Sequence, residues 1–163
     1  MAQRDNEQDT GNSSGQGQFA IQKVYVKDLS FETPHSPGIF QEKGNPSVNM
    51  DLANGASPLG DSYYEVVLSI TVTMSFEDKT VYLVEVQQAG IFLIKGFPEE
   101  NLEHVLATIC PNILFPFARE VVSDLVTRGG FPQLLLAPVN FEALYQEQRK
   151  KKSRASTASE AKH

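Results

Sequence analysis

The side chains that could support catalysis are few, and their spacing does not favour it. The chain of 163 residues contains one cysteine, Cys110, and three histidines, His35, His104 and His163. His104 and Cys110 lie six residues apart, which on a continuous helix separates them by about 240° around the axis. A nucleophilic Cys–His pair would therefore need a sharp bend near Pro111. No two histidines have the spacing of metal ligands, so the sequence predicts neither a metal nor a cofactor.

The carboxylates also give little support for acid–base chemistry. Asp28 and Glu32 lie four residues apart in a predicted strand, roughly 13 Å by strand rise, which is too far for a glycosidase-type pair. Glu99, Glu100 and Glu103 are more simply explained as the N-terminus of a helix, where negative charge is favourable. The sequence contains no phosphate-binding loop, G-x-S-x-G or H-E-x-x-H motif. We therefore expect that the protein is not an enzyme.

Composition and charge narrow the class of protein further. The chain has no run of about 18 apolar residues and no apolar stretch behind a basic start, so we expect neither a transmembrane helix nor a secretory signal. A single cysteine is most simply explained by a reducing cytoplasm. The net charge is −6, although residues 149–163 hold six basic side chains and one acidic side chain. An acidic body predicts a basic partner rather than nucleic acid.

The two ends differ in composition from the middle of the chain. Residues 1–18 are dominated by Gly, Ser, Gln, Asn and acidic residues, and they cannot bury enough apolar surface to become ordered. We expect them to form a disordered N-terminal arm. Residues 149–163 are predicted to be a second disordered tail, which is basic. Residues 19–148 are expected to form a single domain.

Four segments alternate apolar and polar side chains with the period of two that β-strands require. They cover residues 19–32, 47–52, 63–76 and 80–88. The link at residues 77–79 is short, so the last two strands should pair as an antiparallel hairpin. The segments 33–46 and 53–61 are rich in Pro and Gly, and we expect them to be loops.

The same alternation assigns side chains to the two faces of the sheet. In the first strand it predicts one face made of Phe19, Ile21, Tyr25, Leu29 and Phe31. It predicts an opposite face made of Val24, Val26, Asp28, Ser30 and Glu32. In the last strand it separates two residues, Leu83 and Glu85, from Tyr82, Val84, Val86 and Gln88.

Helices follow the strands along the chain. One begins at Pro98, and Pro111 and Pro116 are expected to interrupt it before a second helical run over residues 117–127. A third, amphipathic helix is predicted for residues 139–149. Strands followed by helices favour an α+β fold, with an antiparallel sheet covered on one face. Phe40 and Phe131 lie in loop-like segments, where they could accept apolar segments of other chains.

Several longer strings in the sequence carry a resemblance to a known family. These are IQKVYVKDLSFE, YEVVLSITVT, EVQQAGIF, CPNILFPFARE and RGGFPQLLLAPVNF. They resemble SecB, the bacterial protein-export chaperone family, over residues from about Phe19 to Leu144. The resemblance implies a four-stranded antiparallel sheet with helices packed on one face, assembled as a homotetramer that is a dimer of dimers.

The resemblance also implies a function without catalysis. SecB holds unfolded precursor proteins in an export-competent state and delivers them to SecA, the motor of the Sec translocon, without using ATP. No cofactor, nucleic acid or membrane insertion is implied, and the location is cytoplasmic. A SecB-like chaperone dedicated to one partner, such as an antitoxin, is the alternative, and breadth of clients discriminates the two.

The family implies roles for particular residues of this sequence. Its SecA-binding surface matches Asp28, Glu32, Leu83 and Glu85. Its residues for tetramer assembly match Tyr82, Val84, Val86 and Gln88. Its client-binding grooves match Phe40, Val48, Met50, Leu52, Phe141, Leu144 and Tyr145.

Two features depart from the family pattern. The loop after Phe40 reads QEKGNPSV, with Gly44 and without the tryptophan that family members often carry there. The C-terminal tail is basic from Arg149 to Arg154, whereas tails in the family are often acidic or polar. The first departure bears on an aromatic subsite for clients, and the second bears on contact of the tail with SecA.

Overall fold

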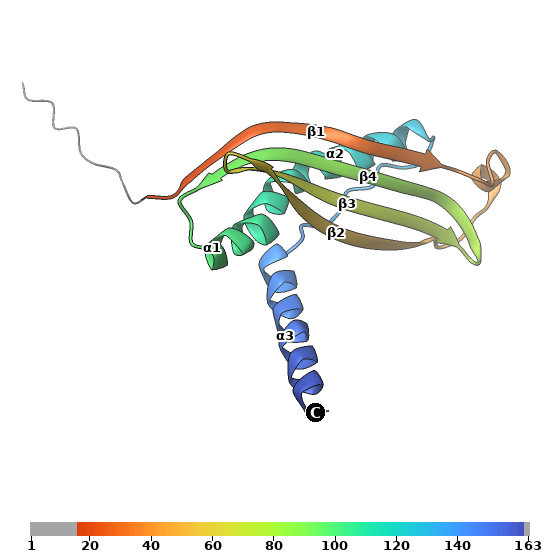
Figure 1. Ribbon diagram of the computed structural model, residues 1–163. Coiled ribbons are helices and arrows are strands. Elements are labelled where there is room, and N and C mark those ends of the chain that lie inside the picture. The colour runs from red at the N-terminus through yellow and green to blue at the C-terminus, as the bar shows by residue number, and fades with distance from the viewer. Residues whose placement is uncertain (1–15, 162–163) are drawn as a thin grey trace, which may run out of the picture.

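A computed structural model describes residues 16–161 and shows one sheet with a long helix across one of its faces (Figure 1). The strands pair antiparallel in the order β1-β4-β3-β2. Their bounds are β1 Gln18–Glu32, β2 Ser47–Gly60, β3 Tyr63–Phe76 and β4 Lys79–Lys95. The predicted α+β class, with a four-stranded antiparallel sheet covered by helix on one face, is confirmed.

The strand β2 is longer than the sequence indicates, because residues 53–60, which were expected to be a loop, continue it to Gly60. β2 is an edge strand, so one row of its N–H groups points away from the sheet and needs no partner strand. Pro58, which has no N–H, is therefore accommodated opposite Tyr64. A turn at Asp61 and Ser62, both with positive φ, then leads into β3.

Two irregularities in β1 change which residues share a face. The register with β4 shifts between Ile21 and Lys23 and again between Val26 and Asp28. Each shift reverses the alternation of side chains. Consequently Val24 and Val26 lie on the helix-covered face, and Tyr25 lies on the open face, which corrects the prediction for these residues.

The helices on the sheet form one unbroken helical segment. α1 (Glu99–His104), a π-helical turn η2 (Val105–Ile109) and α2 (Cys110–Arg128) follow one another without a loop. The expected interruption at Pro111 and Pro116 is therefore wrong. Pro111 directly follows the π-helical turn, where the regular α-helical hydrogen-bond pattern is already interrupted, and Pro116 lies on the exposed side of α2. The Thr108 hydroxyl in the π-helical turn donates to the carbonyl of His104, the last residue of α1, at 2.7 Å.

The core lies between α2 and the two central strands. On α2, fully buried residues recur every four positions, at Cys110, Leu114, Ala118, Val122 and Val126. They pack on the even-numbered side chains of β3 and β4. A Cβ added to Gly90 would lie 3.0 Å from Leu114 Cδ2, so glycine at this position allows the helix to approach the sheet closely. The helix Glu99–Arg128 is long and apolar enough to cross a membrane, but this buried stripe identifies it as the core helix.

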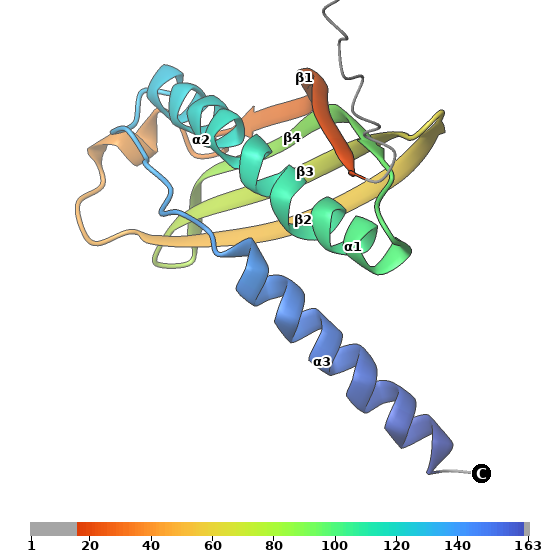
Figure 2. The same cartoon turned by 90° about the vertical axis from the view of Figure 1, so that its left-hand side faces the viewer.

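The C-terminal part of the chain leaves the sheet. Residues 131–140 have no regular structure, and α3 (Phe141–Glu160) then projects away from the body (Figure 2). Asn140 caps α3 by accepting a hydrogen bond from the Ala143 N–H at 2.9 Å, as its sequence position suggests. The helix extends well beyond residue 149, so residues 149–160 are helical where a disordered tail was expected. Lys, Arg and Ala are good helix formers, and they extend a helix that is already nucleated. The expected N-terminal arm falls almost entirely on residues 1–15, outside the described residues.

A substitution in the α2 stripe tests this packing. We expect Leu114→Ala to lower the free energy of unfolding by about 2–5 kcal/mol, because it leaves a cavity between helix and sheet. Urea unfolding at fixed protein concentration measures the change. Leu135→Ala, which truncates a leucine that is 69% exposed, is the matched control and should cost less than about 0.5 kcal/mol. Equal effects of the two substitutions would contradict the assignment of α2 as the core helix.

Candidate binding surfaces

The open face of the sheet carries the expected acidic surface. In the register of β1 and β4, Glu32 pairs with Leu83, Ser30 with Glu85, and Asp28 with Gln87. Paired residues of antiparallel strands point to the same face. The four residues that the family associates with SecA, Asp28, Glu32, Leu83 and Glu85, therefore lie together on the face opposite α2. Within residues 16–161, Asp28, Glu32 and Glu85 form no ion pair, so their negative charges remain uncompensated.

A second charged cluster lies on the same face and was missed from the sequence. Lys27 Nζ donates to Glu65 Oε1 at 2.7 Å, and the Tyr25 hydroxyl also donates to the Glu65 carboxylate. Hydrogen bonds from Lys27 and then Tyr25 hold the pKa of Glu65 below its usual range. Burial, together with Glu65, raises the pKa of Tyr25 to about 12. Glu65 is thus ionised and neutralised by Lys27, which leaves the net negative charge to the uncompensated carboxylates.

The residues associated with assembly lie on the opposite face, as the alternation predicts. Tyr82, Val84, Val86 and Gln88 are each at most 2% exposed within this chain. Tyr82 packs against Phe31 and Phe131. The Gln88 side-chain amide donates to the Tyr25 carbonyl at 3.1 Å, which ties β4 to β1. The four residues are therefore part of the core on the helix-covered face.

An apolar surface beside α2 remains uncovered. Ile21, Val26 and Leu29 lie on the helix-covered face of β1, but each is 40–50% exposed, because α2 does not reach this edge of the sheet. Phe117 on α2 is also exposed. Sequence alternation could not assemble this surface, because the two irregularities in β1 place Val26 on the opposite face to the one predicted.

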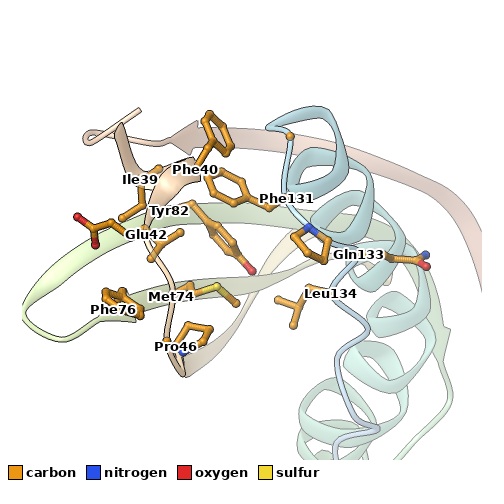
Figure 3. Close-up of a pocket in the computed structure, with 14 residues that line it drawn as sticks. Ile39, Phe40, Glu42, Pro46, Met74, Phe76, Tyr82, Phe131, Gln133 and Leu134 are labelled. Carbon is orange, nitrogen blue, oxygen red and sulfur yellow. The ribbon is translucent and has the colours of Figure 1, made fainter. Parts of the chain in front are cut away.

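A groove lies on the helix-covered face at the end of the sheet where β3 turns into β4 (Figure 3). Its cavity volume is about 460 Å³, and we call it the aromatic groove. Phe40 and Phe131 pack against each other with ring centroids 5.0 Å apart, and Tyr82 packs on Phe131 at the same distance. Of the predicted client-binding residues only Phe40 lines this groove. The other large apolar side chains in its lining are Ile39, Met74, Phe76, Val81, Tyr82, Phe131 and Leu134, and Glu42 and Gln133 also line it.

The remaining client-binding residues lie along β2 and α3. A smaller groove of about 120 Å³, the β2–α3 groove, is lined by Leu52, Phe141, Leu144 and Tyr145. Phe141 and Tyr145 are 6% exposed, so they form its wall, whereas Leu144 is exposed at its rim. Val48 and Met50 point to the same side of β2 as Leu52. The predicted set is therefore divided between two grooves, with Val48 and Met50 on β2.

Gly44 lies in the loop between β1 and β2, residues 33–46, which we call the crossover loop, and it lies close to the ring of Phe76. Gly44 has a φ of +151° and a Cβ at this position would overlap the ring of Phe76. The Phe76 ring therefore occupies the space that a side chain at position 44 would need. An aromatic side chain from β3 thus lines the groove directly beside this loop.

The cysteine and the histidine that could have formed a nucleophilic pair have separate environments. Cys110 is fully buried against the sheet, and burial raises the pKa of its thiol to about 12. His104 Nε2 lies 2.6 Å from Glu142 Oε2, so the imidazole links α1 to α3. The thiol is therefore protonated at neutral pH and packs as an apolar group.

Comparison with known proteins gives consistent results. A family model described as "Preprotein translocase subunit SecB" matches residues 12–152. The "Protein-export protein SecB" of Nitrosococcus oceani is 54% identical over 165 residues and is matched over 100% of both chains. That of Methylococcus capsulatus is 56% identical, covering 84% of this chain and 88% of the relative.

A solved structure gives the fold independently of close sequence similarity. A SecB-like chaperone of Mycobacterium tuberculosis, in complex with a peptide from the HigA1 antitoxin, superposes with a TM-score of 0.57 at 24% identity. The match covers 74% of this chain and 87% of that chain. At this identity the likeness shows the fold alone.

The contact between Gly44 and Phe76 yields a prediction. We expect Gly44→Ala to lower the free energy of unfolding by about 1 kcal/mol or more, because the added Cβ displaces the Phe76 ring and the backbone φ is unfavourable for alanine. Chemical denaturation measures the loss. Gly55→Ala is the control, since a Cβ there meets no atom within 4 Å, and it should be neutral or slightly stabilising. Adding Phe76→Leu should recover part of the loss, and an absence of recovery would argue against this contact.

Proposed function

The chain belongs to the SecB family of protein-export chaperones, and we propose that it holds unfolded precursor proteins, without ATP, and delivers them to SecA. The observation that carries the proposal is the full-length similarity to the curated SecB of Nitrosococcus oceani. The apolar grooves on one face of the sheet and the uncompensated acidic surface on the other are compatible with two partners of different chemistry.

Client binding is supported by the aromatic groove and the β2–α3 groove. The aromatic groove lies at the hairpin end of β3 and β4, and the β2–α3 groove lies along β2, so the two offer separate apolar sites to one long unfolded chain. Methionine and aromatic side chains adapt to varied ligands, which suits a surface that must accept many sequences. The curated relatives are export proteins, so the alternative of a single dedicated partner is not favoured.

We propose that the functional unit is a dimer of dimers. The exposed apolar surface of Ile21, Val26, Leu29 and Phe117 supports this proposal, because a soluble monomer would leave it in contact with water. We propose that four buried residues of β4 contribute to assembly indirectly, through the position of α2: Tyr82, Val84, Val86 and Gln88. These buried side chains set the position of α2, and α2 carries Phe117.

We propose that SecA docks on the open face at Asp28, Glu32, Leu83 and Glu85. Glu32 lies opposite Leu83, and Glu85 and Asp28 follow on the same face, so a basic partner finds both charge complementarity and an apolar side chain to bury. The proposed location is the cytoplasm, where precursors are synthesised and meet the motor.

Native mass spectrometry tests the chaperone proposal. We expect a tetramer of about 72 kDa from the 18.0-kDa chain, and we expect it to bind a chemically unfolded, slow-folding precursor but not the same protein once folded. A precursor folded before mixing is the control. A monomer or dimer that ignores unfolded chains would show that the family fold is retained without the family function.

Charge reversal on the open face tests the docking proposal. The double substitution Asp28→Lys and Glu85→Lys should weaken SecA binding by at least about tenfold, the loss of roughly 1.4 kcal/mol, while tetramer mass and client binding stay unchanged. Isothermal titration calorimetry measures the affinity. Asp51→Lys, an exposed carboxylate on β2 at the far edge of the sheet, is the control and should have a small effect. Wild-type affinity in the double variant would contradict this docking surface.

A further inference from the structure

The floor of the aromatic groove contains a polar atom that packing does not explain. The Tyr82 side chain is fully buried, and within residues 16–161 its hydroxyl has no hydrogen-bond partner. Two other buried polar atoms, on Thr33 and Gln88, are also unpartnered, but neither residue lines this groove. The ring of Tyr82 stacks on Phe31 and packs on Phe131, contacts that a phenyl ring would make equally well. The hydroxyl therefore adds a desolvation cost without a compensating bond in the free protein.

The direction in which the Tyr82 hydroxyl points indicates where a hydrogen-bond partner could lie. In Figure 3 the Tyr82 oxygen points between the side chains of Met74 and Leu134, which line the same groove. Met74 has a flexible thioether side chain, and Leu134 lies in the irregular segment 131–140 rather than in a helix or strand. Both side chains are only partly buried, so the region in front of the hydroxyl is less completely enclosed than the core. A main-chain group that lies between Met74 and Leu134 would face the Tyr82 hydroxyl, while its own apolar side chain fills the aromatic groove beside them.

An apolar groove alone cannot bind an extended chain without a cost. Each apolar side chain of an unfolded protein carries a main-chain carbonyl and N–H, and burying these groups without partners is unfavourable. A hydroxyl is suited to meet this need for any sequence, because every residue offers the same main-chain carbonyl. Burial raises the pKa of the Tyr82 phenol, so the group keeps its proton and is a donor at neutral pH.

Resting on the proposed client binding, we propose that the Tyr82 hydroxyl is the main-chain anchor of the aromatic groove. It donates a hydrogen bond to a backbone carbonyl of a bound unfolded segment that lies between Met74 and Leu134, and the bulky apolar side chain of that segment fills the groove beside Phe40 and Phe131. The groove thus recognises an apolar side chain together with its extended backbone, rather than apolar surface alone.

Removal of this one oxygen tests the anchor. Fluorescence anisotropy with a labelled, extended peptide rich in Phe, Leu, Gly and Ser measures affinity for the wild-type full-length chain and for Tyr82→Phe. We expect about fivefold weaker binding by Tyr82→Phe, the loss of one net hydrogen bond, with an unfolding midpoint unchanged or raised. Tyr25→Phe is the control, because its hydroxyl bonds Glu65 on the opposite face and its removal should leave peptide affinity unchanged.

A second arm identifies the acceptor on the peptide. Single amide-to-ester replacements along the peptide weaken one carbonyl acceptor at a time. One position should lower affinity for the wild-type chain and have no effect on Tyr82→Phe, as expected for two groups that interact directly.

The outcomes separate the anchor from client binding itself. If the wild-type chain and Tyr82→Phe bind the peptide equally well, the proposal that Tyr82 anchors the main chain is wrong. The proposal that the protein binds unfolded clients is then kept. A lowered unfolding midpoint in Tyr82→Phe would mean that the hydroxyl has a partner in the free protein, which also overturns the anchor. Failure of the wild-type chain to bind any of the peptides contradicts the proposed client binding and the anchor together.

Discussion

One geometric constraint governs this molecule: a single helix cannot cover a sheet of four strands. Strands lie about 4.8 Å apart, and a helix with its side chains is about 10–12 Å wide. The buried stripe from Cys110 to Val126 therefore covers the central strands β3 and β4 and leaves both margins of the same face apolar and open. Gly90 brings α2 close to the sheet, but closeness does not widen the covered area.

The two uncovered margins have different surroundings and hence different uses. At the β1 margin, Ile21, Val26 and Leu29 form an apolar strip whose side chains are 40–50% exposed. Elsewhere on this face other segments form walls: α3 beside β2 at the β2–α3 groove, and the loop 33–46 with the segment 131–140 around the aromatic groove at the hairpin end of β3 and β4. A flat strip suits a rigid second copy, whereas walled grooves suit single side chains of an extended chain.

The sequence predicts the regular elements better than it predicts the site. Alternation correctly separates Leu83 and Glu85 from Tyr82 and Val84, because β4 is regular in this part. It fails for Val26 because a one-residue irregularity is invisible in a pattern of period two. Prolines misled in the same way twice, because each was expected to interrupt an element: Pro58 is tolerated in an edge strand, and Pro111 directly after a π-helical turn. The aromatic groove combines residues 39–46, 74–82 and 130–134. The sequence indicated Phe40 and Phe131, but the shape of the groove follows from tertiary packing that local patterns do not contain.

Weak grooves are an advantage for a protein that must release what it holds without ATP. Burying one large apolar side chain gives about 1.5–3 kcal/mol, which alone corresponds to a dissociation constant above about 1 mM. A single groove therefore binds and releases quickly, and tight holding requires several grooves on one long unfolded chain. The proposed assembly of four copies would multiply the grooves without strengthening any of them. A client that is removed segment by segment breaks one weak contact at a time. A client that folds buries the apolar side chains on which every contact depends, so it no longer binds.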